Sequence, residues 1–362
     1  MKRFFKFFMW AMAGTFFLVA CSSDDETSTT DDDGGGPSLG DYQYGYFVLN
    51  EGKYNEGNAT VSFVGDNGVI HHNIFETVNG SSLGDVAQHV DFNEDYAYIV
   101  LNGSNTIEVV NRYTFESVGS VNSGLNNPRY IEFYEGKAYV SNWGDPLSGA
   151  DDYIAIINLE TNAVVGTISV AEGPEKMDIG GSKLFVAHKG GWSHGNTVSV
   201  INLSNNTVET TLEVRDVPDS IQVEGDFLYV LCSGKPIWTG EATPGALLKI
   251  KLSDYEFDSS IPFEPTWDPI NLVVSGGNIY FTLGVEVYKK SLGSPVAPAL
   301  LFSATEQGVD AIYGFNVRAN MIYLTDAKDY NSNGSLLIYS SSGMLLHQHT
   351  MGLIPNGIYF HN

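Results

Sequence analysis

The chain has few cysteines and few basic residues. It holds two cysteines, Cys21 and Cys232, in 362 residues, too few for the disulfide framework that stabilises small secreted domains. Lys and Arg number 18 against 43 Asp and Glu, which gives a formal net charge of −25. A surface of this sign repels the phosphates of nucleic acids and of anionic lipids. The composition therefore argues against nucleic acid as a partner and against direct docking on a lipid surface.

Long helical periodicity is also missing from the chain. Its absence argues against a parallel α/β fold and against a helical bundle. Glycine and aromatic residues are abundant instead, with 39 Gly, 20 Tyr and 20 Phe in a chain that is 43% apolar. These residue types favour strands joined by tight turns and suffice for a packed core. The composition predicts an all-β protein.

The one apolar stretch near the start is interpreted as an export signal. Three basic residues lie within the first six positions and precede an apolar run over 7–20, which is too short for a comfortable membrane span. We expect residues 1–20 to be cleaved. The sequence Leu18-Val19-Ala20-Cys21 resembles the lipobox of bacterial lipoproteins, which implies that Cys21 is lipidated and becomes the first mature residue. An ordinary secretory signal or a retained anchor are the alternatives.

Residues 21–41 are too polar to bury anything and predict a flexible tether after the lipid. The acidic run Asp24-Asp25-Glu26 is similar to the signal with which one group of Gram-negative bacteria exports lipoproteins to the outer face of the outer membrane. This resemblance implies an outer-membrane protein exposed at the cell surface, which contacts the membrane through its lipid only. A plain solvated spacer is the alternative.

One pattern recurs from residue 42 onward. A Pro-x-x-Ile-x-Phe or Val segment leads through a Gly-containing turn to an aromatic β-run, then a loop and a second β-run, as in 128–133, 138–142 and 153–158. Seven such units follow one another, about 46 residues apart on average, which suits four-stranded propeller blades. The aromatic residue in the second strand of each unit is Tyr46, Tyr98, Tyr139, Phe185, Tyr229, Tyr280 or Tyr323.

The two ends of the repeat region complement each other. The first unit begins at 45–50 without a preceding Pro-x-x-Ile-x-Phe strand, whereas the chain ends on that strand, at 355–360, with nothing paired after it. We therefore expect the C-terminal strand to complete the first blade, which removes the edges that an open array would expose. Residues 42–362 are predicted to form a seven-bladed β-propeller of four-stranded antiparallel blades, with the first blade closed by the C-terminal strand.

The repeats carry a family resemblance. Units of the form Pro-x-x-Ile, Lys-Leu-Phe-Val-Ala and Asn-Thr-Val-Ser-Val-Ile-Asn-Leu resemble YVTN-type, YncE-like seven-bladed propellers over nearly all of 42–362. The opening Val48-Leu49-Asn50-Glu51-Gly52, with Asn58-Ala59-Thr60-Val61-Ser62 and the lipobox, is similar to BtuG-type surface lipoproteins that partner TonB-dependent transporters. The resemblance implies a binding protein for a small nutrient, with a cobalamin-like corrinoid as the first candidate. It does not identify the ligand, because propellers host many activities.

Aromatic residues gather in one class of loop. Turns between the second and third strands, and links between blades, open on the same face of a propeller. All four tryptophans outside the signal fall in these loops, where exposed rings mark recognition surfaces. The alternative is that each tryptophan packs between neighbouring blades. The predicted ligand-binding residues are Tyr54, Trp143, Trp192, His194, Trp238, Trp267 and Tyr330.

Two loops carry patterns that suggest metal ions. The segment 329–334 matches the first half of a calcium loop, but Ser340 in the twelfth position excludes an EF-hand. Calcium on Asp326, Asp329, Asn331 and Asn333 remains one interpretation, and a polar turn is the other. His188 and His194 share a loop, but their spacing matches no metal site, and we expect a solvated pair.

Catalytic motifs are incomplete. Gly191-Trp192-Ser193-His194-Gly195 matches the Gly-x-Ser-x-Gly elbow of hydrolases but joins two strands, whereas the elbow requires a strand followed by a helix. Calcium-dependent propeller lactonases arrange Glu, Asn and Asp around the central tunnel, and Glu175, Asp219 and Asn271 lie near the starts of inner strands without completing a motif. We expect a protein that is not an enzyme, with a lactonase-like hydrolase or a protein-interaction scaffold as the alternatives.

Overall fold

The computed structural model describes residues 38–145 and 148–361. The predicted signal, the lipidation site Cys21 and the tether up to residue 37 lie outside the described residues. From Leu39 onward the chain forms one compact unit. Among the described residues, no helix combines the length and the apolar character that crossing a membrane requires.

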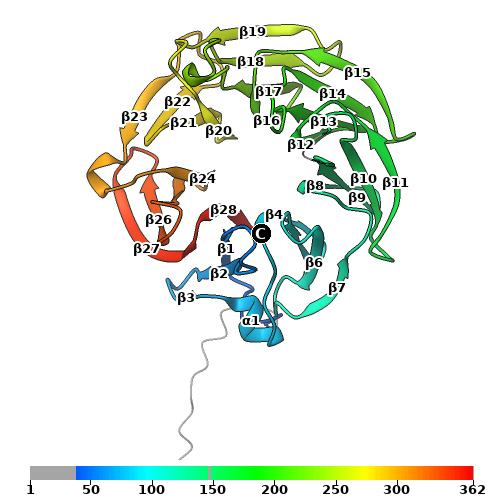
Figure 1. Ribbon diagram of the computed structural model, residues 1–362. Helices are drawn as coiled ribbons and strands as arrows, with labels where there is room; N and C mark the ends of the chain where they lie inside the picture. The colour runs from blue at the N-terminus through cyan, green and yellow to red at the C-terminus, as the bar shows by residue number, and fades with distance from the viewer. Residues whose placement is uncertain (1–37, 146–147, 362) are drawn as a thin grey trace, which may run out of the picture. The chain divides into compact units, whose positions relative to one another are not determined.

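The unit is a ring of seven four-stranded antiparallel sheets around a central opening (Figure 1). From the inner strand outward, the first blade consists of β28 (Pro355–Phe360), β1 (Gly45–Asn50), β2 (Thr60–Gly65) and β3 (Ile70–His71), and the second of β4 (Ala87–Asn93), β5 (Tyr96–Leu101), β6 (Thr106–Asn111) and β7 (Ser117–Val121). In the same order, the third blade consists of β8 (Pro128–Tyr134), β9 (Lys137–Asn142), β10 (Tyr153–Asn158) and β11 (Ala163–Ser169). The fourth consists of β12 (Pro174–Gly180), β13 (Lys183–His188), β14 (Thr197–Asn202) and β15 (Thr207–Glu213).

Three further blades complete the ring, and the short helices lie in connections. The blades are β16 (Pro218–Glu224), β17 (Phe227–Cys232), β18 (Ala246–Lys251), β19 (Phe257–Pro262); β20 (Ile270–Ser275), β21 (Asn278–Leu283), β22 (Glu286–Ser291), β23 (Ala299–Ser303); and β24 (Ile312–Arg318), β25 (Met321–Asp326), β26 (Asn333–Ser340), β27 (Leu345–Leu353). The helices are α1 (Ile74–Asn79), η1 (Ile237–Thr239) and η2 (Thr305–Gln307). The repeat pattern had not indicated α1.

The predicted closure of the ring is confirmed. Strand β28 pairs antiparallel with β1, with Phe47 opposite Tyr359 and Val48 opposite Ile358. In Figure 1 the red C-terminal strand lies beside the blue first strand. The side-chain amide of Asn356 also donates to the carbonyl oxygen of Ala87 at 2.8 Å, so the closing strand is bonded to the second blade as well.

Apolar side chains fill each junction between neighbouring blades. Because both faces of a blade are covered, its middle strands are nearly continuous apolar runs, as in β5 and β13. The outer strands alternate or are mostly exposed, as in β15. All seven predicted aromatic markers of the second strands are buried, and so is Cys232, the free thiol. Each buried large apolar side chain contributes about 1.5–3 kcal/mol, so the blades stabilise one another.

The inner strands share an irregularity near their starts. In β8, Pro128 pairs with Asn142 but Ile131 pairs with Val140, so two residues of the inner strand stand opposite one of its partner. The same bulge interrupts pairing in the other inner strands, near Ala87, Pro174, Pro218, Ile270, Ile312 and Pro355. A bulge re-aims side chains locally. As a result, two adjacent residues of a blade contribute to the tunnel wall at this level.

Removing the closing strand tests how far stability depends on the ring. Deleting 354–362 exposes the inner edge of β1 and uncovers the faces that Ile358 helps to bury. We expect the melting temperature, measured by circular dichroism, to fall by about 10 °C or more. Removing Asn362 alone is the control and should leave the transition unchanged. A truncated protein that melts like the intact one would show that β28 is dispensable.

Candidate ligand-binding site

One face of the ring carries the connections in which the predicted site residues fall. In an antiparallel blade, the turn from the second to the third strand opens on the same side as the link to the next blade. We call this side the loop face; it includes the segments 51–59, 143–152, 189–196, 233–245 and 327–332, of which 146–147 lie outside the described residues. Each inner strand starts at the loop face, so the bulged residues lie near it.

Two tryptophans stand out from the loop face. The side chains of Trp192 and Trp238 are 77% and 79% exposed. The ring of His194 lies 6.2 Å from that of Trp238, and Ile237 is also exposed. Tyr54 projects from the corresponding turn of the first blade and is 72% exposed. Exposed aromatic rings are favourable only when something covers them, so these residues are the candidates for a recognition surface.

The other two predicted tryptophans are packed against neighbours. Trp267 lies against Phe263 and Tyr288, with ring centroids 5.8 Å and 5.1 Å away, as expected for packing between blades. Trp143 donates its indole N–H to the carbonyl oxygen of Pro174 at 3.0 Å, and the Arg129 guanidinium lies 4.2 Å from its ring centroid. Trp143 therefore belongs to the wall of the tunnel mouth.

A cavity of about 810 Å³ occupies the central tunnel. Its lining comes from the inner strands and includes the three residues Glu175, Asp219 and Asn271 that the sequence pointed to. Tyr313 also lines it and packs edge-on, at 5.7 Å, against the partly exposed ring of Tyr330. This contact joins the predicted aromatic surface to the tunnel.

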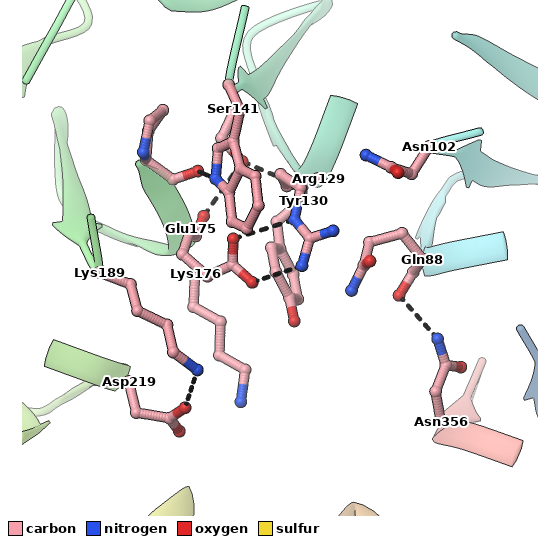
Figure 2. A network of polar contacts seen from close by, with 12 residues as sticks. Gln88, Asn102, Arg129, Tyr130, Ser141, Glu175, Lys176, Lys189, Asp219 and Asn356 are labelled. Atoms are coloured by element: carbon pink, nitrogen blue, oxygen red, sulfur yellow. Dashed lines mark hydrogen bonds and ion pairs between the residues drawn. The ribbon is translucent and has the colours of Figure 1, made fainter. Parts of the chain in front are cut away.

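Two ion pairs lie where the tunnel meets the loop face (Figure 2). Arg129 donates two hydrogen bonds to the Glu175 carboxylate, at 3.0 Å and 2.8 Å, and Lys189 donates one to Asp219 at 2.7 Å. Burial alone would raise the pKa of Asp219, but the ammonium groups of Lys189 and Lys176 hold it well below its usual range. The mouth therefore carries charges of both signs that are already matched.

A third carboxyl group, that of Glu51, lies near those of Glu175 and Asp219 and differs from them in its hydrogen bonding. Burial raises the pKa of Glu51, and the hydroxyl of Tyr313 donates to its carboxylate. The Oε2 atom of Glu51 is buried without a hydrogen-bond partner among the described residues. The Glu51 carboxylate is thus an acceptor whose hydrogen bonding is incomplete within the part of the chain that the structure describes.

Three inner strands carry a carboxyl group at the same level, deeper than the ion pairs of the mouth. Asp91, Glu132 and Asp178 are the fifth residues of their inner strands, β4, β8 and β12. Burial raises the pKa of all three, to about 7 for Asp91, and repulsion among them adds to the shift of Asp91 and Glu132. These buried carboxyl groups are therefore protonated more readily than exposed ones.

Two of the residues suggested for calcium, Asp326 and Asp329, accept hydrogen bonds from the protein's own backbone. One oxygen of Asp326 accepts the backbone N–H groups of Asp310, Ala311 and Lys328. Asp329 accepts those of Asn331 and Ser332, which is the geometry of a polar turn. Among the described residues, no group of three or more His, Cys, Asp or Glu side chains is placed to hold a metal ion.

The pair of histidines is not the solvated pair that the sequence suggested. His188 is the last residue of β13, is buried, and shares a 2.8 Å hydrogen bond with the Ser199 hydroxyl. Burial lowers its pKa to about 4. His194 alone lies on the loop face. Ser193 donates its hydroxyl hydrogen to the carbonyl oxygen of Gly190 at 3.0 Å.

Sequence reasoning missed several residues of the tunnel mouth. Arg129, Lys176, Lys189 and Tyr313 line the cavity but had not been singled out. A signal was present, because the two residues after the first position of the inner strand are polar in several units, as in Arg129-Tyr130 and Glu175-Lys176. In a regular strand, two adjacent residues face opposite ways, and only the bulge brings both to one cavity.

A second cavity of about 490 Å³ lies where the last blade meets the first. Its lining includes Tyr46, Tyr323 and Phe360, whose ring centroids are 5.0–5.4 Å apart. The turns 65–68 and 318–321 contribute to it, which places it away from the loop face. None of the predicted site residues lines this cavity.

Comparisons with known proteins support the fold. Residues 44–347 match the model of DUF5074, described as a domain of unknown function, and no curated protein matches the sequence. A quinoprotein alcohol dehydrogenase-like protein from Bacteroides thetaiotaomicron superposes with a TM-score of 0.65 at 17% identity, over 89% of this chain and 79% of that one. BamB from Moraxella catarrhalis gives 0.55 at 11% identity, over 89% and 88%. Hydrazine synthase from Kuenenia stuttgartiensis gives 0.60 at 13%, over 75% and 88%.

The ion pair at the mouth gives a stability prediction. Arg129→Met leaves the buried Glu175 carboxylate without its partner, which should lower the free energy of unfolding by about 3 kcal/mol. Adding Glu175→Met should recover most of that loss, because the uncompensated charge is then gone. Urea titration measures both effects. Lys183→Met, which breaks a partly exposed pair with Glu209, is the control and should cost less than about 1 kcal/mol. Equal losses in the single and double variants would contradict this explanation.

Proposed function

The chain belongs to the DUF5074 family, and we propose that this seven-bladed member binds a small nutrient ligand on its loop face. In this proposal it is an outer-membrane lipoprotein at the cell surface that passes the ligand to a TonB-dependent transporter. A corrinoid such as cobalamin is the first candidate ligand. The protein itself makes or breaks no covalent bond in the ligand.

One observation carries the binding role. Trp192 and Trp238 project from neighbouring blades on the face where the tunnel opens, and both rings are more than three-quarters exposed. Flat apolar rings supply most of the contact energy of a binding surface, whereas polar groups fix the orientation of the ligand. The loop face offers both, because Arg129 of one ion pair lies against the Trp143 ring and Lys189 of the other is in the loop that carries Trp192.

The dimensions of the tunnel cavity suit a small-molecule ligand. A cavity of about 810 Å³ falls within the range of small-molecule sites, about 300–1,000 Å³. A large planar ligand would cover the exposed rings and extend polar groups into the mouth. This arrangement supports the corrinoid suggested by the resemblance of the repeats to BtuG-type propellers.

The position in the cell rests on the start of the chain. The lipobox-like Leu18-Val19-Ala20-Cys21 and the acidic residues after it support a lipid anchor on the outer face of the outer membrane. A binding protein in that position meets nutrients before they cross the membrane and needs a transporter to continue their uptake. The TonB-dependent transporter is therefore part of the proposal.

Hydrolysis is supported less well than binding. A metal-dependent lactonase needs a metal in the tunnel, but Glu175 and Asp219 are each held by a basic side chain. The backbone N–H of Asn271 also donates to Asp219, at 3.1 Å. The three residues that suggested a lactonase are thus used in contacts within the protein.

Substitution of the exposed tryptophans tests the proposed site. In isothermal titration calorimetry with cyanocobalamin, at least one of Trp192→Ala and Trp238→Ala should weaken binding by about thirtyfold, or about 2 kcal/mol, the cost of removing a central anchor. Both side chains are exposed, so neither change should alter the melting temperature.

Phe257→Ala is the matched control, because Phe257 is an exposed ring on the outer strand β19. It should bind cyanocobalamin with unchanged affinity. Wild-type protein that does not bind cyanocobalamin would reject the corrinoid. Normal binding by both tryptophan variants would reject the loop face as the site.

A further inference from the structure

The inner strands of three consecutive blades place hydrogen-bond donors at one level of the tunnel. His89, Tyr130 and Lys176 are the third residues of β4, β8 and β12, and all three line the cavity. They lie between the ion pairs of the mouth and the carboxyl groups of the fifth position. We call these three residues the donor tier.

Lys176 lacks a counterion in the described part of the chain. Its ammonium group donates to the Ser220 hydroxyl at 3.1 Å, and it makes no ion pair within the described residues, unlike Arg129 and Lys189. In Figure 2 its side chain extends into the tunnel past Glu175, with no contact to a carboxylate. Burial lowers the pKa of Lys176, which reflects the cost of holding this charge without a partner.

The nearest carboxylate is committed to other groups. Lys189 donates to one oxygen of Asp219 at 2.7 Å, and the Ser220 hydroxyl donates to the other at 2.5 Å. The backbone N–H of Asn271 also donates to that second oxygen. Asp219 therefore attracts Lys176 from a distance without contacting it.

The other two members of the tier are neutral donors. The Nδ1 atom of His89 accepts the backbone N–H of Ile131 at 3.4 Å, so the hydrogen of the neutral ring is on Nε2. Burial lowers the pKa of His89 to about 3, which keeps the ring neutral. Burial raises the pKa of Tyr130 well above its usual value, so its hydroxyl keeps its proton as well.

We propose that the donor tier binds a carboxylate group of a ligand that enters from the loop face. One ammonium group and two neutral donors match a single negative charge and the lone pairs of two oxygens. A dianion such as phosphate fits less well, because the tier supplies only one full positive charge and the carboxyl groups of Asp91 and Glu132 line the same cavity. The route of entry rests on the proposed function, but the binding itself can be measured separately.

The test compares benzoate with benzamide, which have the same shape but differ in charge. Titrations of the purified mature protein, followed by saturation-transfer NMR, should show benzoate binding at least about tenfold more tightly. Lys176→Met should abolish this preference by weakening benzoate and not benzamide, whereas Lys176→Arg should retain it. Lys183→Met, which removes a lysine of β13 that does not line the cavity, should behave as wild type.

Lys176→Met is suited to the test because it replaces an unpaired charge by an apolar side chain of similar length. Such a replacement is tolerated in buried positions. The melting temperature of this variant should match that of the wild type. Equal affinities for benzoate and benzamide, or an unchanged preference in Lys176→Met, would overturn the proposal. Tighter binding of inorganic phosphate than of benzoate, lost in Lys176→Met, would overturn the assignment to a carboxylate.

Failure of this proposal is distinguishable from failure of the proposed function. Small acids need only the tunnel, so Trp192→Ala should bind benzoate normally even where it loses cyanocobalamin. Loss of the benzoate preference with intact cyanocobalamin binding rejects the donor tier alone. Loss of cyanocobalamin binding with an intact benzoate preference rejects the corrinoid and retains the donor tier.

Discussion

The pairing of β28 with β1 is the constraint on which the rest of the molecule depends. Each blade has two apolar faces, and each face is covered only by the next blade in the ring, so an open array would leave two faces and two strand edges exposed. Pairing between residues that are some 310 positions apart in sequence closes that gap. Because the ring is closed, the seven inner strands are held at fixed positions around one tunnel, and their side chains meet there.

The bulge near the start of every inner strand converts this scaffold into a site. The bulge brings two adjacent residues, such as Glu175 and Lys176, to the tunnel, where a regular strand would bring only one of them. The result is a sequence of levels with different chemistry: matched ion pairs at the mouth, hydrogen-bond donors below them, and carboxyl groups below the donors. The rigid inner strands carry the polar side chains, whereas the loops carry the aromatic rings. Recognition of polar groups and contact with apolar rings are therefore separated along the tunnel axis.

The repeat pattern predicted the fold to the level of single strands, including the closing strand, because each blade must bury the same apolar positions. The tunnel was predicted only in part. Arg129 and Glu175 are 46 positions apart and meet only because consecutive inner strands lie side by side. The sequence of a single repeat does not reveal this contact. Similarly, the exposure of Trp192 and the partial burial of Trp267 depend on neighbours from other blades, so the loop positions alone did not distinguish them.

The central claim is that ligand binds at the loop face over the tunnel mouth, and hydrogen–deuterium exchange with and without cyanocobalamin tests it most directly. Backbone amides of 189–196 and 233–245, the loops that carry Trp192 and Trp238, should exchange more slowly when ligand is bound. Amides of 65–68 and 318–321, at the cavity between the last and first blades, should be unaffected. Protection confined to those two turns, with none on the loop face, would contradict the account.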